Sequence, residues 1–222
     1  MRVSDIAKAG SPDDVRAALA EREQQLRHSA DRLLSRTELG AASRVLGGIA
    51  RATARQLAIL RSSFDHPIEV SASACRTVFE LNVLCRYARL SDAYMDAVIT
   101  WRASDETALL KGALRLSDGF TPQAEQVVRD RVTHIEQKLQ QYGLNAAPPV
   151  SLFKMAEAAC VEEEYKALYG FYSKYVHATG WLVCANDAER DCYEYRQIFL
   201  IQSQTYASDT HSRVIELLDR ND

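Results

Sequence analysis

Long segments with few helix breakers are the feature that most restricts what this chain can fold into. Nine glycines and five prolines are spread over 222 residues, and stretches rich in alanine, leucine, arginine and glutamate run between them. Alternation of apolar and polar residues with a period of two is scarce, so a helical reading fits nearly everywhere. The sequence therefore predicts an all-α fold, a single bundle of about eight helices.

Capping residues and breakers indicate where these helices begin and end. Ser11-Pro12 is a strong helix start, because serine caps and proline suits the first helical position. Gly47-Gly48 is either a soft point or a site of close packing. The expected helices cover about 12–36, 38–63, 68–90, 92–102, 105–116, 122–142, 152–160 and 188–218, with a tyrosine-rich helix after residue 160 and a turn region over 178–187.

The clearest break in the chain is the loop at 145–150, with the sequence NAAPPV. It is too short to mark a domain boundary by itself. We therefore expect one domain over 1–222, with its core over about 68–218 and the helices of 11–63 packed on that core.

Composition excludes several classes of protein. A hydrophobic fraction of 47% and a formal net charge of −3 are typical of a soluble globular chain without a global basic field for nucleic acid. No apolar run approaches the roughly 18 residues of a membrane span, and the first ten residues lack a hydrophobic signal core. We expect a cytoplasmic protein with no membrane partner.

Cysteine and motif patterns point to no metal and no cofactor. The five cysteines are scattered and form no C-x2-C pair, so neither a zinc site nor a disulfide framework is indicated. No E-x-x-H, P-loop, G-x-G-x-x-G or H-E-x-x-H occurs. The remaining candidates for chemistry are isolated polar residues on apolar helices.

The stretch 68–90 is apolar on nearly every side, which is typical of a helix at the centre of a bundle. It nevertheless contains Arg76, Glu80 and Asn82. Arg76 and Glu80 are four residues apart and can form an ion pair. That pair is either structural, at the surface or in the core, or a polar site in which Glu80 orients the Arg76 guanidinium toward an anion.

The stretch Glu162–Gly180 carries a stripe of hydrogen-bonding side chains. Tyr165, Tyr169, Ser173 and His177 follow one another at intervals of four residues, so they lie one above the next on a helix. Such groups are costly to bury without partners. We therefore expect this stripe to face Arg76 and Glu80, so that all six side chains converge on one buried polar pocket.

A histidine in this position can act as a general base near neutral pH. We take His177, Arg76 and Ser173 as candidate catalytic residues, and Lys174 as a second candidate for a phosphate partner. The strand-turn-helix elbow of serine hydrolases is absent, so the Ser173–His177 pair does not indicate that class. The ligand-binding candidates are Glu80, Asn82, Tyr165, Tyr169 and Lys174.

Two segments together resemble a family of uncharacterised bacterial helical domains related to the HEPN-like proteins of abortive-infection and toxin–antitoxin systems. The segments are Arg76-Thr-Val-Phe-Glu80-Leu-Asn82, and Met155-Ala156 with Tyr165-x3-Tyr169-x3-Ser173-x3-His177. The resemblance covers about half of the chain, from Val70 to Gly180.

The resemblance implies a HEPN-like core, a homodimer, and a metal-independent ribonuclease in which a histidine takes the ribose 2′-hydroxyl proton and an arginine steadies the phosphate. His177 matches that histidine. Gly170, Phe171 and Tyr172 stand where the arginine belongs, and Arg76 could supply the charge from a neighbouring helix.

Two functions remain open, and whether the protein is an enzyme is not decided by its sequence. The first is binding of a small anionic ligand or a partner chain, such as a cognate antitoxin or defence partner, by the polar cluster. In its variant without a ligand, the same cluster is purely structural and only fixes the fold. The second is cleavage of RNA. The aromatic final helix indicates core or subunit contact through Tyr193, Tyr195, Phe199, Leu200 and Tyr206.

Overall fold

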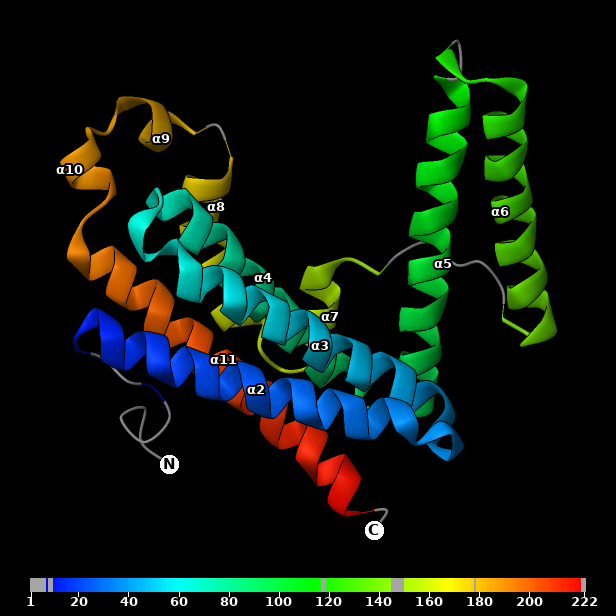
Figure 1. Cartoon of the computed structure of the whole chain (residues 1–222), viewed down its shortest axis with the longest axis horizontal. Coiled ribbons are helices and arrows are strands. Elements are labelled where there is room, and N and C mark those ends of the chain that lie inside the picture. Colours follow the sequence, from blue (N-terminus) through cyan, green and yellow to red (C-terminus); the bar gives the residue numbers. More distant parts are fainter. Residues whose placement is uncertain (1–6, 8–9, 117–118, 145–149, 178, 221–222) are drawn as a thin grey trace. The chain divides into compact units, whose positions relative to one another are not determined.

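A computed structural model describes residues 7, 10–116, 119–144, 150–177 and 179–220. The described part is helical, with short 3-10 turns and no strand, which confirms the all-α fold class (Figure 1). Residues 145–149, most of the predicted loop, lie outside the described residues. The α-helices are α2 (Pro12–Ser35), α3 (Gly40–Ser62), α4 (Ile68–Ala88), α5 (Asp92–Arg115), α6 (Pro122–Gln141), α7 (Leu152–Ala158), α8 (Glu162–Val176), α9 (Gly180–Cys184), α10 (Asp187–Arg190) and α11 (Tyr193–Asp219).

The chain divides into two compact units. One unit contains α2, α3 and α4 together with α7 to α11, and the other contains α5 and α6. The single domain over 1–222 stays a prediction, and the units are described separately. All candidate residues for chemistry lie in the first unit.

Helix α4 is the element around which the first unit is built. It packs against α3, α7, α8 and α11, and its buried side chains lie on most of its circumference. A helix that is apolar all round has no face to give to water, so it takes the central place. The predicted position of this helix, including its contact with the tyrosine-rich helix α8, is confirmed.

Helices α2 and α3 form the most extensive pair; both contact α11, and α3 also contacts α4. Close packing explains Gly47. A Cβ atom built on Gly47 would lie 2.8 Å from Cγ of Leu34, which is too near for a real side chain. Helix α3 runs through this position without a break, so Gly47 is a close-packing site rather than a soft point.

Two predicted boundaries were wrong. Ser104 does not start a new helix, because α5 is continuous from Asp92 to Arg115 and serine is tolerated inside a helix. The final helix begins at Tyr193, because the short helix α10 occupies the start of the range predicted for it, and the expected turn region contains the short helix α9. A capping box between Asn186 and Glu189 starts α10, which ends at Arg190, and Cys192 is the N-cap of α11.

The aromatic residues of α11 serve mainly the core of the first unit. Phe199, Leu200 and Tyr206 are buried within the chain, whereas Tyr193 is exposed. The ring of Phe199 packs near those of Phe171, Tyr172 and Tyr175 of α8. In the second unit, α5 and α6 lie side by side (Figure 1) and are joined by ion pairs such as Lys111–Glu136.

Candidate functional site

Arg76 is the residue around which the predicted cluster assembles. Its side chain leaves α4 and is 16% exposed. Nε donates to Glu80 Oε1 over 2.8 Å, one helical turn further along α4. Nη1 lies 2.9 Å from His177 Nε2, which belongs to the end of α8. The guanidinium therefore connects α4 with the end of α8, through two residues that are 101 positions apart in the sequence.

Tyr169 supplies an aromatic surface beneath the same guanidinium. Arg76 Cζ lies 4.8 Å from the centre of the Tyr169 ring, which is cation–π geometry. Tyr169 stacks on Tyr165 with ring centres 5.2 Å apart, and Tyr165 stacks on the buried Phe79. The stack ties the exposed cluster to the core, so Tyr169 is held in position before any ligand arrives.

His177 stands where α8 ends. Its backbone is extended, with φ −115° and ψ 156°, and its N–H closes the last turn on the Ser173 carbonyl. A guanidinium can only donate hydrogen bonds, so Nε2 must be the acceptor in the contact with Arg76. The proton of the neutral imidazole then sits on Nδ1, and a lone pair on Nε2 faces the cation.

The charge of Arg76 is well secured. Burial works against the charged form, but the hydrogen bond and the charge of Glu80 outweigh it and raise the pKa of the guanidinium. Burial also raises the pKa of Tyr165, and the neighbouring Tyr169 and Glu80 add to that effect. The site therefore keeps a permanent cation next to an imidazole.

The cluster lies at the surface and not in a buried pocket. Tyr169 is 37% exposed and His177 is exposed as well. The expectation of burial was wrong because α8 ends at His177, and its polar stripe reaches the solvent there. A ligand can therefore approach Arg76 from the side of His177 without any opening of the fold.

Ser173 and Lys174 do not join the contacts of Arg76. Ser173 Oγ is buried and has no hydrogen-bond partner among the described residues, so it does not pair with His177. The Lys174 side chain is exposed. The assignments of Ser173 as a catalytic residue and of Lys174 as a phosphate partner stay predictions.

Asn82 belongs to a different polar network. It is 1% exposed and its amide nitrogen donates to the Tyr206 carbonyl, to Asp209 and to Thr210 on α11. Two residues correspond to about 200° around a helix, so Asn82 points away from the face of Glu80. Its assignment as a ligand-binding residue is therefore corrected: Asn82 fastens α4 to α11.

Residues that the sequence reading passed over complete this network. Arg86 and Arg213 both donate to Oδ2 of Asp209, over 3.1 and 2.7 Å. Burial disfavours the charged carboxylate, but the hydrogen bonds from Arg213 and Asn82 prevail and lower the pKa of Asp209. In the sequence, the interval of four residues between Asn82 and Arg86 could have indicated this second set of polar contacts on α4.

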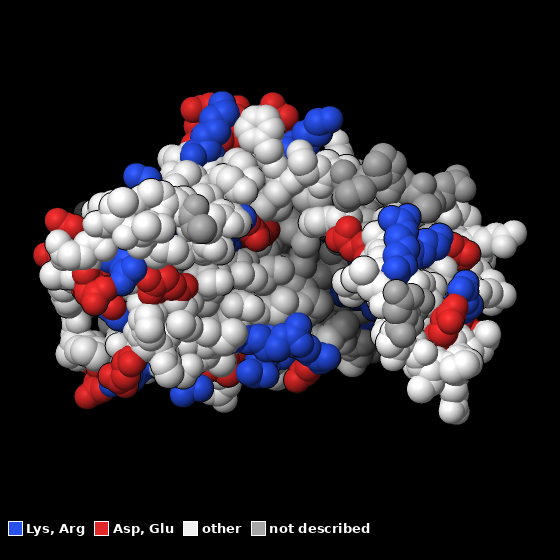
Figure 2. Space-filling model, turned by 90° about the horizontal axis from the view of Figure 1, so that it is seen from above, with Lys and Arg blue, Asp and Glu red and all other residues white. Residues whose placement is uncertain are grey.

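The face of the molecule seen in Figure 2 shows no broad field of one sign. In the face seen in Figure 2, positive and negative side chains lie next to one another within each unit. This agrees with the net charge of −3. An anion would have to be held by local contacts rather than by long-range attraction.

Among the described residues, no group of three or more His, Cys, Asp or Glu side chains is placed to hold a metal ion. None of the described helices combines the length and the apolar character that crossing a membrane requires. Comparison with family models, curated proteins and solved structures found no match to this chain.

Proposed function

We propose that Arg76, Tyr169 and His177 form a binding site for a phosphate-bearing anion. The contact between Arg76 Nη1 and His177 Nε2, at 2.9 Å, carries the proposal. It places a fixed cation and a group able to become a second cation at one accessible point. Arginine suits phosphate because its planar donors match the oxygens.

Glu80 takes part by holding the guanidinium, not by meeting the ligand. It occupies the Nε side, while Nη1 on the other side faces His177. A guanidinium has five N–H donors, so the two contacts leave donors for an anion. An anion that replaces the imidazole as acceptor keeps Arg76 in place and frees His177 to donate.

The test is binding of inorganic phosphate, pyrophosphate and adenosine monophosphate, followed by phosphorus NMR. We expect Arg76→Gln to weaken binding about tenfold or more, which corresponds to about 1.4 kcal/mol, the order of one charge-assisted hydrogen bond. Arg51→Gln removes the same charge from an exposed pair with Asp31 and should leave binding unchanged. Equal affinity in wild type and Arg76→Gln would refute the site.

Acidity gives a second readout of the same site. Histidine is the side chain that ordinarily changes charge between about pH 5 and 8. A protonated His177 can no longer accept from Arg76 but can donate to an anion, so protonation of this imidazole should strengthen binding. His177→Gln should abolish that pH dependence. A dependence that survives in His177→Gln would place its origin elsewhere.

Cleavage of RNA is the second candidate, favoured by the Nε2 lone pair that lies next to a cation. In this reaction a phosphate of the RNA would replace the imidazole as acceptor of Arg76, and the freed Nε2 would accept the proton of a ribose 2′-hydroxyl. The 2′-oxygen attacks the adjacent phosphorus and expels the 5′-oxygen, which takes up a proton from water. The product is a 2′,3′-cyclic phosphate, and Arg76 would offset the charge that builds up on the phosphate. The resemblance to HEPN-like ribonucleases, with a homodimer in bacterial defence, provides the biological setting of this proposal.

Incubation with RNA in the presence of a chelator tests this candidate. Activity in wild type and in His134→Ala, whose imidazole is exposed in the second unit, together with loss in His177→Ala, would support cleavage. Equal activity in wild type and His177→Ala would contradict it. Light scattering at low micromolar concentration, with monomer alone, would argue against the homodimer.

A further inference from the structure

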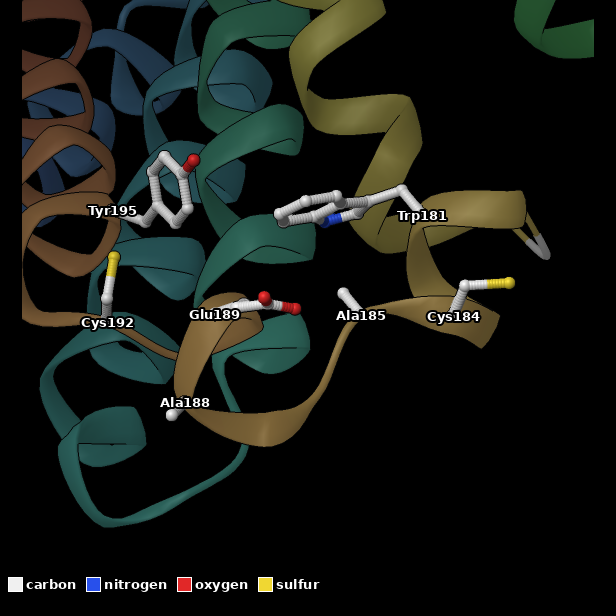
Figure 3. A pocket seen from close by; sticks show the side chains of 7 residues that line it. All are labelled: Trp181, Cys184, Ala185, Ala188, Glu189, Cys192 and Tyr195. Carbon is white, nitrogen blue, oxygen red and sulfur yellow. The ribbon is translucent and has the colours of Figure 1, made fainter.

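A pocket with a volume of about 560 Å³ lies beyond the C-terminal end of α8, among α9, α10 and the start of α11 (Figure 3). It is formed within the first unit and does not involve Arg76 or Tyr169. The pocket is open to solvent, since Cys184, Ala188 and Glu189 are exposed, and its volume is in the range of small-molecule sites. Its walls are mostly apolar, and Glu189 is the one charged side chain among the described residues that line it.

Two aromatic rings form a corner of this pocket. The rings of Trp181 and Tyr195 have centres 6.4 Å apart and stand at 85° to each other. Tyr195 is held from behind by Phe171 and Tyr175, at 6.0 and 6.1 Å. Rings fixed at right angles present electron-rich faces in two directions, which is the arrangement that attracts an organic cation.

Glu189 is oriented into the same corner by its capping role. Its Oε2 accepts from the Asn186 N–H over 3.1 Å, and its own N–H donates to Asn186 Oδ1 over 3.0 Å. Its other oxygen, Oε1, accepts no hydrogen bond from any described residue. Figure 3 shows the carboxylate below the indole of Trp181, on the side of the cavity.

The arginines nearest in sequence are already paired and do not cancel this carboxylate. Arg190 forms ion pairs with Asp187 and with Glu69 and donates to the Leu182 carbonyl. Arg196 is paired with Asp191. The negative charge of Glu189 thus remains available to a ligand.

We propose that this pocket binds a small molecule through a methylated ammonium group, of the quaternary type found in choline. Such a group has no N–H to satisfy, and it needs only aromatic faces, apolar contact and one counter-charge. A primary ammonium has three donors and would need more acceptors than Glu189 provides here. Ala185 and Ala188 leave room for the methyl groups opposite Trp181.

Choline and its uncharged carbon analogue 3,3-dimethyl-1-butanol form a matched pair of probes, because they share shape and differ in charge. Trp181 is one of two tryptophans, so the Trp101→Phe protein makes Trp181 the sole indole reporter. We expect choline to change its fluorescence saturably, with a dissociation constant of about 1 mM or lower. Glycine betaine, whose carboxylate would oppose Glu189, should bind more weakly than choline.

Variants in the same background separate the proposed contacts. Glu189→Gln keeps the capping geometry and should weaken choline about fivefold, the factor for one charge pair at about 4 Å in water. Glu194→Gln removes an exposed carboxylate that does not line the pocket and should change nothing. Ala188→Leu should fill the cavity and abolish binding while circular dichroism stays unchanged.

Either of two results would overturn the proposal. One is the absence of saturable binding by choline in the folded protein. The other is equal affinity for choline and 3,3-dimethyl-1-butanol, because the pocket would then recognise shape without charge.

Discussion

Replacement of Asp209 by asparagine tests the polar network that fastens α4 to α11. The Oδ2 atom accepts hydrogen bonds from Asn82 over 2.8 Å, from Arg213 over 2.7 Å and from Arg86 over 3.1 Å. Asp209→Asn keeps the size of the side chain and removes its charge. Two guanidinium groups then lose the carboxylate that they share.

The magnitude follows from these contacts and their exposure. A hydrogen bond to a charged group contributes about 1.5–3 kcal/mol. The Asp209 side chain is 28% exposed, so solvent screens part of this contribution, and the three donors share one oxygen. We expect a loss of about 2 kcal/mol in the free energy of unfolding, and therefore a fall of about 4–8 °C in Tm for a chain of this length.

The dependence on pH has a defined sign. The pKa of Asp209 is lower in the folded protein than its ordinary value. Its stabilisation is therefore complete above the unfolded pKa of about 3.9 and is lost as pH falls through the folded value. The gap in unfolding free energy between wild type and Asp209→Asn should be full at about pH 7 and should narrow below about pH 4.

Urea unfolding followed by circular dichroism at a series of pH values measures this gap. Asp31→Asn is the matched control, because Asp31 pairs with Arg51 at the surface and should contribute about 0.5 kcal/mol or less. An Asp209→Asn protein as stable as wild type at neutral pH would refute the reasoning. So would a gap that stays the same in acid, because the ionised carboxylate would then not be its cause.

Two further predictions concern packing and cysteine reactivity. Gly47→Ala should destabilise the protein by about 1 kcal/mol, because overpacking against Leu34 outweighs the better helix propensity of alanine. A Cβ on Gly48 would have nothing within 4 Å, so Gly48→Ala should stabilise the protein by about 0.5–1 kcal/mol. Urea unfolding measures both changes, and a change of the same sign in the two variants would contradict the close approach of Leu34 to Gly47. A thiol reagent should label the exposed Cys160 and Cys184 quickly and should react with the buried Cys75 and Cys85 only on unfolding. Burial excludes the reagent from Cys75 and Cys85 and raises the pKa of their thiols to about 11 and about 12, respectively. Mass spectrometry of partly labelled protein gives the order of labelling, and early labelling of Cys75 would contradict the fold.

The central helix and its neighbours were predictable because their signal lies in the sequence itself. A segment that is apolar on all sides has to be surrounded, which placed α4 in the middle. The interval of four between Arg76 and Glu80 predicted their ion pair. The contact between Arg76 and His177 was predictable because burying polar groups on apolar helices without partners is costly. The position of this contact at the surface was not predictable from that argument.

Other features depend on tertiary contacts or on weak local signals. The spacing of Glu80 and Asn82 in the sequence does not indicate which neighbouring helix each side chain contacts. Only the packing of α11 against α4 shows that Asn82 donates a hydrogen bond to Asp209. The start of α10 as a separate short helix rests on the capping pair Asn186 and Glu189, a local signal that spans only four residues.

The order of the chain has a consequence for synthesis on the ribosome. Helix α4 belongs to a unit whose remaining helices, α7 to α11, are translated only after the sixty or so residues of α5, α6 and their connections. Until then α4 can contact α3 but not α8 or α11, and apolar surface that these helices later cover is open to chaperones and to other nascent chains. Arg76 can therefore contact His177 only after α5, α6 and α8 have been synthesised.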